Sequence, residues 1–159
     1  MISIRKNTTS LILFVLAVMA GGIAIGILTA PGPWYADLVK PAFNPPNWIF
    51  APVWTLLYLC IAIAGWRIWQ IEPAGLPMKA WFAQMLLNFI WSPLFFVAHR
   101  MDLALGVILL MLALIVTFIY GTWRTDRPAA LLFVPYAAWV AFASVLNGSL
   151  LALNPSVGG

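Results

Sequence analysis

The sequence predicts an all-α integral membrane protein, a bundle of five transmembrane helices with a structured loop between the first two. Composition is the first reason: 64% of the 159 residues are hydrophobic, 8% are charged, and the mean hydropathy is +1.01. Soluble domains carry about 25% charged residues, so a water-soluble fold is excluded. The second reason is five apolar runs, each reaching the ~20 residues with which an α-helix crosses a bilayer: 11–30, 48–70, 79–98, 103–123 and 129–153.

The first run has a second interpretation, because Arg5 and Lys6 precede it as basic residues precede the core of a signal peptide. Its end offers no good small-x-small cleavage site, and its apolar core is longer than the roughly 7–15 residues usual in a signal peptide. We therefore expect an uncleaved first helix, and we treat residues 1–159 as a single membrane domain.

The basic residues predict the orientation. With the N-terminus inside, most of them lie on the inner side of the membrane, as the positive-inside rule favours. The loop at 31–47 then lies outside. Because these charges are spread along the chain, they form no patch for nucleic acid. The inner set is Arg5, Lys6, Arg67, Lys79, Arg124 and Arg127, and the outer set is Lys40 and Arg100.

The first run also contains the pair Gly22-x-x-x-Gly26. Small residues at this spacing let two helix backbones approach closely in a membrane. The contact could lie within one monomer, or it could form the seam of a homodimer. The pattern favours neither alternative.

The segment 31–47 is rich in proline and aromatic residues, whereas most loops between spans are bland. Proline fixes φ and keeps the preceding residue extended, so we expect this loop to hold one shape. We interpret it as a lid over a binding site at the mouth of the bundle.

Three of the five runs carry a stripe of aromatic and polar residues on one helical face. The first and fourth runs carry none, and we expect the fourth to be scaffold. Pro93 predicts a kink or an inserted partner in the third run, since it has no N–H to donate. The stripes are Trp54 and Tyr58 in the second run, Trp81, Gln84, Asn88, Trp91 and Phe95 in the third, and Tyr136, Trp139, Ala143 and Asn147 in the fifth.

The stripes predict a shared cavity. An unpaired amide in hydrocarbon costs several kcal/mol, so Gln84 and Asn88 should face the bundle interior. They could simply join helices, but the interleaved tryptophans favour a pocket wall. Ala143 could leave room for a ligand or permit close helix packing. A neutral, aromatic cavity under the 31–47 loop suits a large, flat, mostly apolar ligand, and membrane lipid surrounds it.

No catalytic or metal-binding constellation is visible. Proton and ion relays need a carboxylate in mid-membrane, and the four carboxylates here lie near span ends. We therefore expect neither a conventional enzyme nor an ion-coupled transporter, with no metal and no obligatory cofactor. The isolated candidates are His99, Cys60, Asp37, Glu72, Asp102 and Asp126.

Several motifs resemble the TspO/MBR family of tryptophan-rich sensory and translocator proteins, in the family's order and over nearly the whole chain. The short stretch before the first span is similar to that of bacterial members. The motifs are Trp34-Tyr35-x-x-Leu38-x-Lys40-Pro41-x-Phe43-x-Pro45-Pro46, Pro52-x-Trp54-Thr55-x-Leu57-Tyr58, Asn88-x-x-Trp91 with Phe95-Phe96, and Val134-Pro135-Tyr136-x-x-Trp139 with Leu146-Asn147.

The resemblance implies a five-helix bundle, commonly a homodimer, that binds porphyrins such as protoporphyrin and haem intermediates. The implied roles are tetrapyrrole sensing, transport or stress regulation. By motif, the lid residues are Tyr35, Pro41 and Asn44, and the pocket residues are Trp54, Asn88, Trp91, Tyr136, Trp139 and Ala143; the stripes add Tyr58, Gln84, Phe95 and Asn147.

Two alternative functions remain. Trp54 and Trp139 match the tryptophans linked to light-dependent porphyrin degradation in bacterial members of the family. A non-catalytic, dimeric interaction protein is the other alternative, with Gly22 and Gly26 as its seam. The mammalian cholesterol-recognition motif needs a Tyr followed by Arg or Lys, and residues 144–154 contain neither, which argues against strong sterol binding through that motif.

Overall fold

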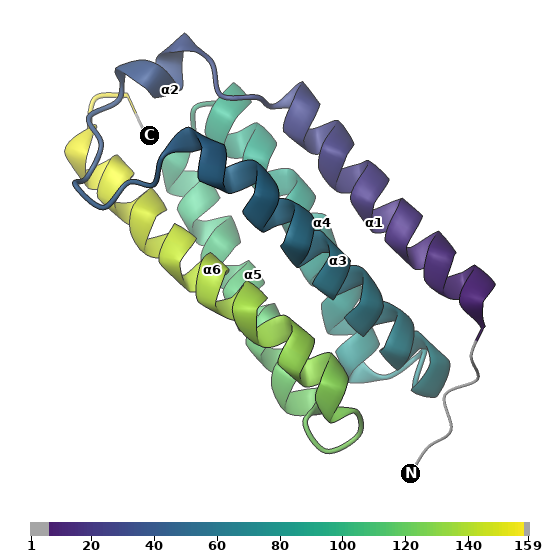
Figure 1. Ribbon diagram of the computed structural model, residues 1–159. Helices are drawn as coiled ribbons and strands as arrows, with labels where there is room; N and C mark the ends of the chain where they lie inside the picture. Colours follow the sequence, from purple (N-terminus) through teal and green to yellow (C-terminus); the bar gives the residue numbers. More distant parts are fainter. Residues whose placement is uncertain (1–6, 158–159) are drawn as a thin grey trace.

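The computed structural model describes residues 7–157, which form a bundle of helices without a strand (Figure 1). Five of these helical segments are long and apolar enough to cross a membrane, and their ends differ from the predicted runs by at most three residues. The predicted fold class is therefore confirmed. The segments are α1 (Thr8–Leu28), α3 (Asn47–Ile71), α4 (Leu76–Ser92) continued by the π-helix η1 (Pro93–Val97), α5 (Met101–Thr122) and α6 (Arg127–Leu153).

Local sequence signals set several helix ends. The side chain of Asn7 caps α1 by accepting a hydrogen bond from the backbone N–H of Ser10 at 3.2 Å. Asp126 caps α6 in the same way, accepting from Ala129 N–H at 3.1 Å. Both caps satisfy an N–H group that has no partner within its own helix.

The loop between the first two spans contains one further helix, α2 (Pro33–Asp37), which lies across the end of the bundle (Figure 1). Pro33 stands at its first position, where its fixed φ suits a helix and its missing N–H costs nothing. A turn follows, in which Asn44 N–H donates to the carbonyl of Pro41 at 3.0 Å. The prediction anticipated a shaped loop but not this helix.

Two of the prolines within the spans, Pro93 and Pro135, have different effects. At Pro93 the α4 helix widens into η1, where Ala98 N–H donates to the carbonyl of Pro93 at 2.9 Å. This change of helix type is the disturbance that the sequence predicted there. Pro135 has no such effect, because α6 continues through it.

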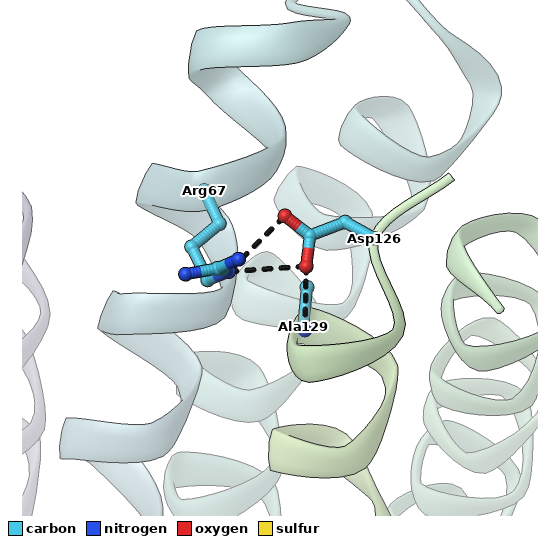
Figure 2. Close-up of polar contacts among 3 residues, drawn as sticks. All are labelled: Arg67, Asp126 and Ala129. Carbon is cyan, nitrogen blue, oxygen red and sulfur yellow. Dashed lines mark hydrogen bonds and ion pairs between the residues drawn. The ribbon is translucent and has the colours of Figure 1, made fainter. Parts of the chain in front are cut away.

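An ion pair joins α3 to the start of α6 at the end of the bundle opposite α2 (Figure 2). Arg67 Nε lies 3.1 Å from both carboxylate oxygens of Asp126. The Asp126 side chain is 3% exposed, so it needs this partner and the Ala129 N–H to offset the loss of water. The pair fixes the turn between α5 and α6 against α3.

The basic residues lie at the two ends of the bundle. Arg67, Lys79, Arg124 and Arg127 are at the end where α3 and α5 finish, and Lys40 and Arg100 are at the α2 end. Arg5 and Lys6 lie outside the described residues. An orientation with the N-terminus inside stays a prediction.

Candidate functional site

A cavity of about 530 Å³ lies in the half of the bundle next to α2. Its volume is within the roughly 300–1,000 Å³ typical of small-molecule sites. Residues of α1, α3, α4, η1, α5 and α6 line it, and Pro31 and Tyr35 close it from the side of the 31–47 segment. Among the described residues, those that line the cavity are all uncharged, and most are apolar or aromatic.

The structure brings most of the predicted ligand-binding residues to this cavity. Pro41, Asn44, Gln84 and Tyr136 are the exceptions, and they lie behind its walls or in the lid. The stripe of the third span therefore predicts the buried face correctly but not the depth of each residue. The predicted residues that line the cavity are Tyr35, Trp54, Tyr58, Asn88, Trp91, Phe95, Trp139, Ala143 and Asn147.

A chain of hydrogen bonds across three helices forms the floor of the cavity. Tyr58 OH donates to Asn88 Oδ1 at 2.8 Å, and Asn88 Nδ2 donates to Tyr136 OH at 2.9 Å. Tyr136 OH in turn donates to Gln84 Oε1 at 2.7 Å. Gln84 and Tyr136 are fully buried, so they orient Asn88 and Tyr58 from behind. Both roles considered for the two amides are present: Gln84 joins helices, and Asn88 also forms wall.

A second polar contact braces the wall nearer the lid. Trp91 Nε1 donates to Asn147 Oδ1 at 3.2 Å, and Asn147 Nδ2 donates to the carbonyl of Met101 at 3.0 Å. This contact ties α4 to α6 and to the first residue of α5. The ring of Trp91 stacks on Phe95, with centroids 5.1 Å apart. The indole thus has a fixed position, and its face forms part of the cavity surface.

The lid closes the cavity with Tyr35 of α2. Its ring meets Phe96 edge-on at 5.4 Å, and its hydroxyl donates to Asn44 Oδ1 at 3.3 Å. Burial raises the pKa of the Tyr35 phenol above its ordinary value, and the bond to Asn44 partly offsets this rise. Tyr35 is therefore a neutral hydrogen-bonding group at the mouth of the site.

The two tryptophans linked by resemblance to porphyrin degradation both line the cavity. Trp54 lies on α3, with its ring 5.3 Å from that of Tyr58. Trp139 lies on α6, with its ring 5.8 Å from that of Phe50. Each is half-buried, so one part of the indole is fixed by neighbours while another faces the cavity.

The glycines of α1 take part in this site. A Cβ atom added at Gly22 would collide with the ring of Tyr58, so the glycine permits close contact between α1 and α3. Gly26 has no heavy atom within 4 Å of such a Cβ, and both glycines line the cavity. Of the two alternatives for this pair, a contact within one monomer or a homodimer seam, Gly22 makes the contact within the monomer. A homodimer stays a prediction, and Gly22 is no longer a candidate for its seam.

Sequence reasoning missed the contribution of α1 and α5. Neither helix carries an aromatic-polar stripe, yet both supply apolar side chains to the cavity, so the prediction that only three helices shape it was wrong. No periodic signal could have found these residues, because apolar side chains occur all round both helices. The residues are Met19, Ile23 and Ile25 of α1 and Ile108 and Met111 of α5.

The described residues contain no group of three or more His, Cys, Asp or Glu side chains that could hold a metal ion. His99 lies outside the cavity, and Cys60 is half-buried on α3. What the cavity offers is a set of aromatic faces and neutral polar groups. Such a surface binds a ligand by burial of apolar area and by shape.

Comparison with known proteins gives a consistent family. The sequence model of the TspO/MBR family matches residues 14–153. The chain is 36% identical to a tryptophan-rich sensory protein of Cereibacter sphaeroides, over 91% of this chain and 92% of the relative. It is 39% identical to the tryptophan-rich protein TspO of Archaeoglobus fulgidus, over 93% of this chain and 99% of the relative.

A mammalian relative matches over a smaller part of both chains. The translocator protein of Homo sapiens is 35% identical, over 72% of this chain and 70% of the relative. The five apolar helices and these matches together show an integral membrane protein. This chain therefore belongs to the TspO/MBR family.

Proposed function

We propose that this protein is a membrane receptor or carrier that binds porphyrin-type tetrapyrroles, such as protoporphyrin and haem intermediates, in the cavity under the 31–47 lid. Its role would be tetrapyrrole sensing, transport or stress regulation. The observation that carries the proposal is an uncharged cavity walled by tryptophans from three different helices: Trp54, Trp91 and Trp139.

The chemistry of the walls supports a flat aromatic ligand. Indole rings bind another ring system by offset or edge-to-face contact, and each buries a large apolar area. Ala143 adds room, because its methyl group stands among larger side chains of α6 on the cavity surface. The Tyr58–Asn88–Tyr136 chain keeps the floor in one arrangement, which lowers the entropy cost of binding.

Quenching of tryptophan fluorescence by protoporphyrin tests the proposal. We expect saturable quenching, with affinity reduced tenfold or more in Trp54→Ala and in Ala143→Leu. Trp123→Ala is the matched control, since Trp123 lies at the far end of α5 and does not line the cavity. Unsaturable quenching, or equal affinity in all variants, would overturn the proposal.

Light-dependent degradation of the bound porphyrin is a second candidate, because Trp54 and Trp139 both line the cavity. A bound porphyrin would lie within reach of either indole, which could supply an electron to the photoexcited ligand. Illumination of the complex with and without oxygen tests this. If the Trp54→Phe and Trp139→Phe variants still form product under light, the degradation proposal is rejected. Binding of porphyrin in the dark would leave the first proposal intact.

We also propose that the lid faces outward, with the N-terminus inside. Four basic side chains at the end opposite the lid support this orientation: Arg67, Lys79, Arg124 and Arg127. Labelling of a cysteine introduced at Phe43 of the lid by an impermeant reagent on intact cells tests it, in a Cys60→Ala background. Labelling only after permeabilisation would reverse the assignment.

A further inference from the structure

We infer that the 31–47 segment is a hinged lid, fixed at Asn154 on α6 and released at a latch between Trp34 and His99. The inference rests on the proposed function of the cavity beneath it and adds how access to that cavity is controlled. Tyr35, Leu38 and Phe43 pack on apolar side chains of the bundle, and beside this packing the lid has two further contacts that differ in kind.

The fixed point is a two-sided bond between a side chain and the backbone. Asn154 Oδ1 accepts from Val39 N–H at 2.9 Å, and Asn154 Nδ2 donates to the carbonyl of Val39 at 2.9 Å. A third bond, from Nδ2 to the carbonyl of Leu150 at 2.8 Å, holds the amide against α6. Asn154 is 8% exposed, so parting this contact would leave its buried amide with the bond to Leu150 alone.

The latch is an aromatic stack without a hydrogen bond between its two rings. The rings of Trp34 and His99 lie 4.1 Å apart and are nearly parallel, with an interplanar angle of 14°. Both side chains are half-buried. Among the described residues, His99 is the one non-glycine residue with positive φ, at 56°. A bulky residue in that conformation is strained, and strain of this kind marks switch regions as well as active sites.

The lid is also bonded to itself. Lys40 Nζ donates to the carbonyls of Tyr35 and Ala36, at 2.7 and 3.0 Å, and so joins α2 to the segment that follows it. Tyr35 OH reaches across the lid to Asn44 at 3.3 Å. These internal contacts survive any movement of the lid as a whole. Once its apolar packing on η1 and α6 also separates, the lid moves as one body about Val39 when the stack at His99 parts.

Such a movement would open the cavity. Tyr35 lines the cavity and packs edge-on against Phe95 and Phe96 of η1, and Trp34 stands next to it in α2. Swinging α2 away from His99 would carry Tyr35 off η1 and unseal the mouth. Parting the stack would then ease both entry and exit of a ligand.

The kinetic consequence separates a latch from a ligand contact. Weakening the latch makes opening easier in the empty and in the occupied protein alike. Association and dissociation rates of protoporphyrin should therefore rise together, while the equilibrium affinity changes little. Loss of a residue that touches the ligand would instead raise dissociation alone.

The experiment compares three variants at the latch, in detergent micelles. His99→Asn removes the ring but keeps a residue that tolerates positive φ, so the fold should be undisturbed. We expect about two- to tenfold faster exchange of protoporphyrin in both directions, as loss of one aromatic pair predicts. His99→Phe keeps a ring and should stay within twofold of the unmodified protein. Arg100→Ala removes the neighbouring side chain, which contacts Asp102 and not the lid, and should change nothing.

Hydrogen exchange without ligand provides the second measurement. In His99→Asn the amides of residues 34–38 should lose protection, whereas the amide of Val39 should keep it. Asn154→Ala should remove the protection of the Val39 amide. By displacing Tyr35, it should also reduce the affinity for protoporphyrin. Its control is Ser156→Ala, because Ser156 is an exposed residue two positions further along the chain. A His99→Asn protein with unchanged exchange and unchanged rates would overturn the latch. If the unmodified protein does not bind protoporphyrin, the proposed function is rejected. The hydrogen-exchange measurement would still decide how the lid is held.

Discussion

The two halves of the bundle are built from the same helices and yet one is solid and the other hollow. In the half near Arg67, α3 presents Gly65 to the ring of Trp81, so closely that an added Cβ would collide with the indole. In the half under the lid, the same helix presents Trp54 to the bundle interior. A ring against a small residue fills space, whereas rings that face one another from three helices hold those helices apart and leave a cavity.

The boundary between the halves is polar. Tyr136 is fully buried beneath the cavity, and its hydroxyl accepts from Asn88 and donates to Gln84. Below it, the ring of Phe133 stacks on Phe118 at 3.9 Å. We therefore expect the solid half and the polar layer to stabilise the fold, and the hollow half to bind the ligand.

The largest effect should follow a cavity made in the solid half. Phe133 is fully buried, so Phe133→Ala should lower the free energy of unfolding by about 3–5 kcal/mol, as truncation of a buried aromatic does. Denaturant titration in micelles measures it. Leu131→Ala, a half-exposed site on the same helix, should cost far less, and equal losses at the two sites would contradict the contrast.

The polar layer should give the next largest effect. Tyr136→Phe leaves Asn88 Nδ2 and Gln84 Oε1 without their partner, which should cost about 1–3 kcal/mol of unfolding free energy. Tyr120→Phe is the matched control, since Tyr120 is 79% exposed on α5. The same denaturant titration compares the two. A Tyr136→Phe protein as stable as the control would show that the layer is not structural.

A substitution in the hollow half should change binding and spare stability. Ala143→Leu places a larger side chain in existing space, so protoporphyrin affinity should fall tenfold or more, about 1.4 kcal/mol, with unfolding free energy unchanged. Ala152→Leu, exposed near the end of α6, should leave both unchanged. Instability of Ala143→Leu would mean that the cavity collapses when empty.

The smallest effect should come from a half-buried polar group on α5. Thr117 is half-buried, and its hydroxyl makes a solvent-exposed bond to the carbonyl of Ala113 in its own helix, so Thr117→Val should change the unfolding free energy by less than about 0.5 kcal/mol. Thr122 makes the same kind of bond, to Phe118, and is itself fully buried. Thermal unfolding should show a larger loss of stability for Thr122→Val than for Thr117→Val. The reverse order would contradict the contrast between the solid half and the hollow half.

The sequence predicted the spans and most of the candidate site for simple reasons. Hydropathy gives the length of each span directly, and helical periodicity places Trp54, Tyr58, Asn88 and Trp91 on buried faces. The polar residues among them had to face inward, because hydrocarbon offers no hydrogen bonds. These inferences depend only on local spacing and on the membrane.

The rest depends on contacts between segments far apart in the chain. Asn154 and Val39 are 115 residues apart, and nothing in either local sequence indicates that they pair. His99 stood among the isolated candidates in the sequence, because its stacking partner lies in another loop. Periodicity also could not tell that Tyr136 stands behind the wall and Trp139 on it, because both share one face of α6.

The π-helical turn at Pro93–Val97 has a consequence for how members of such a fold can diverge. A π-turn is one surplus residue within an α-helix. Deleting a single residue there would restore regular α-helical winding and shift the residues of the turn itself relative to Trp91. Phe96 would then leave its place beneath Tyr35. The seal of the cavity therefore depends on the number of residues in this turn, and a one-residue gap in an alignment would matter more than several exchanges of side chain.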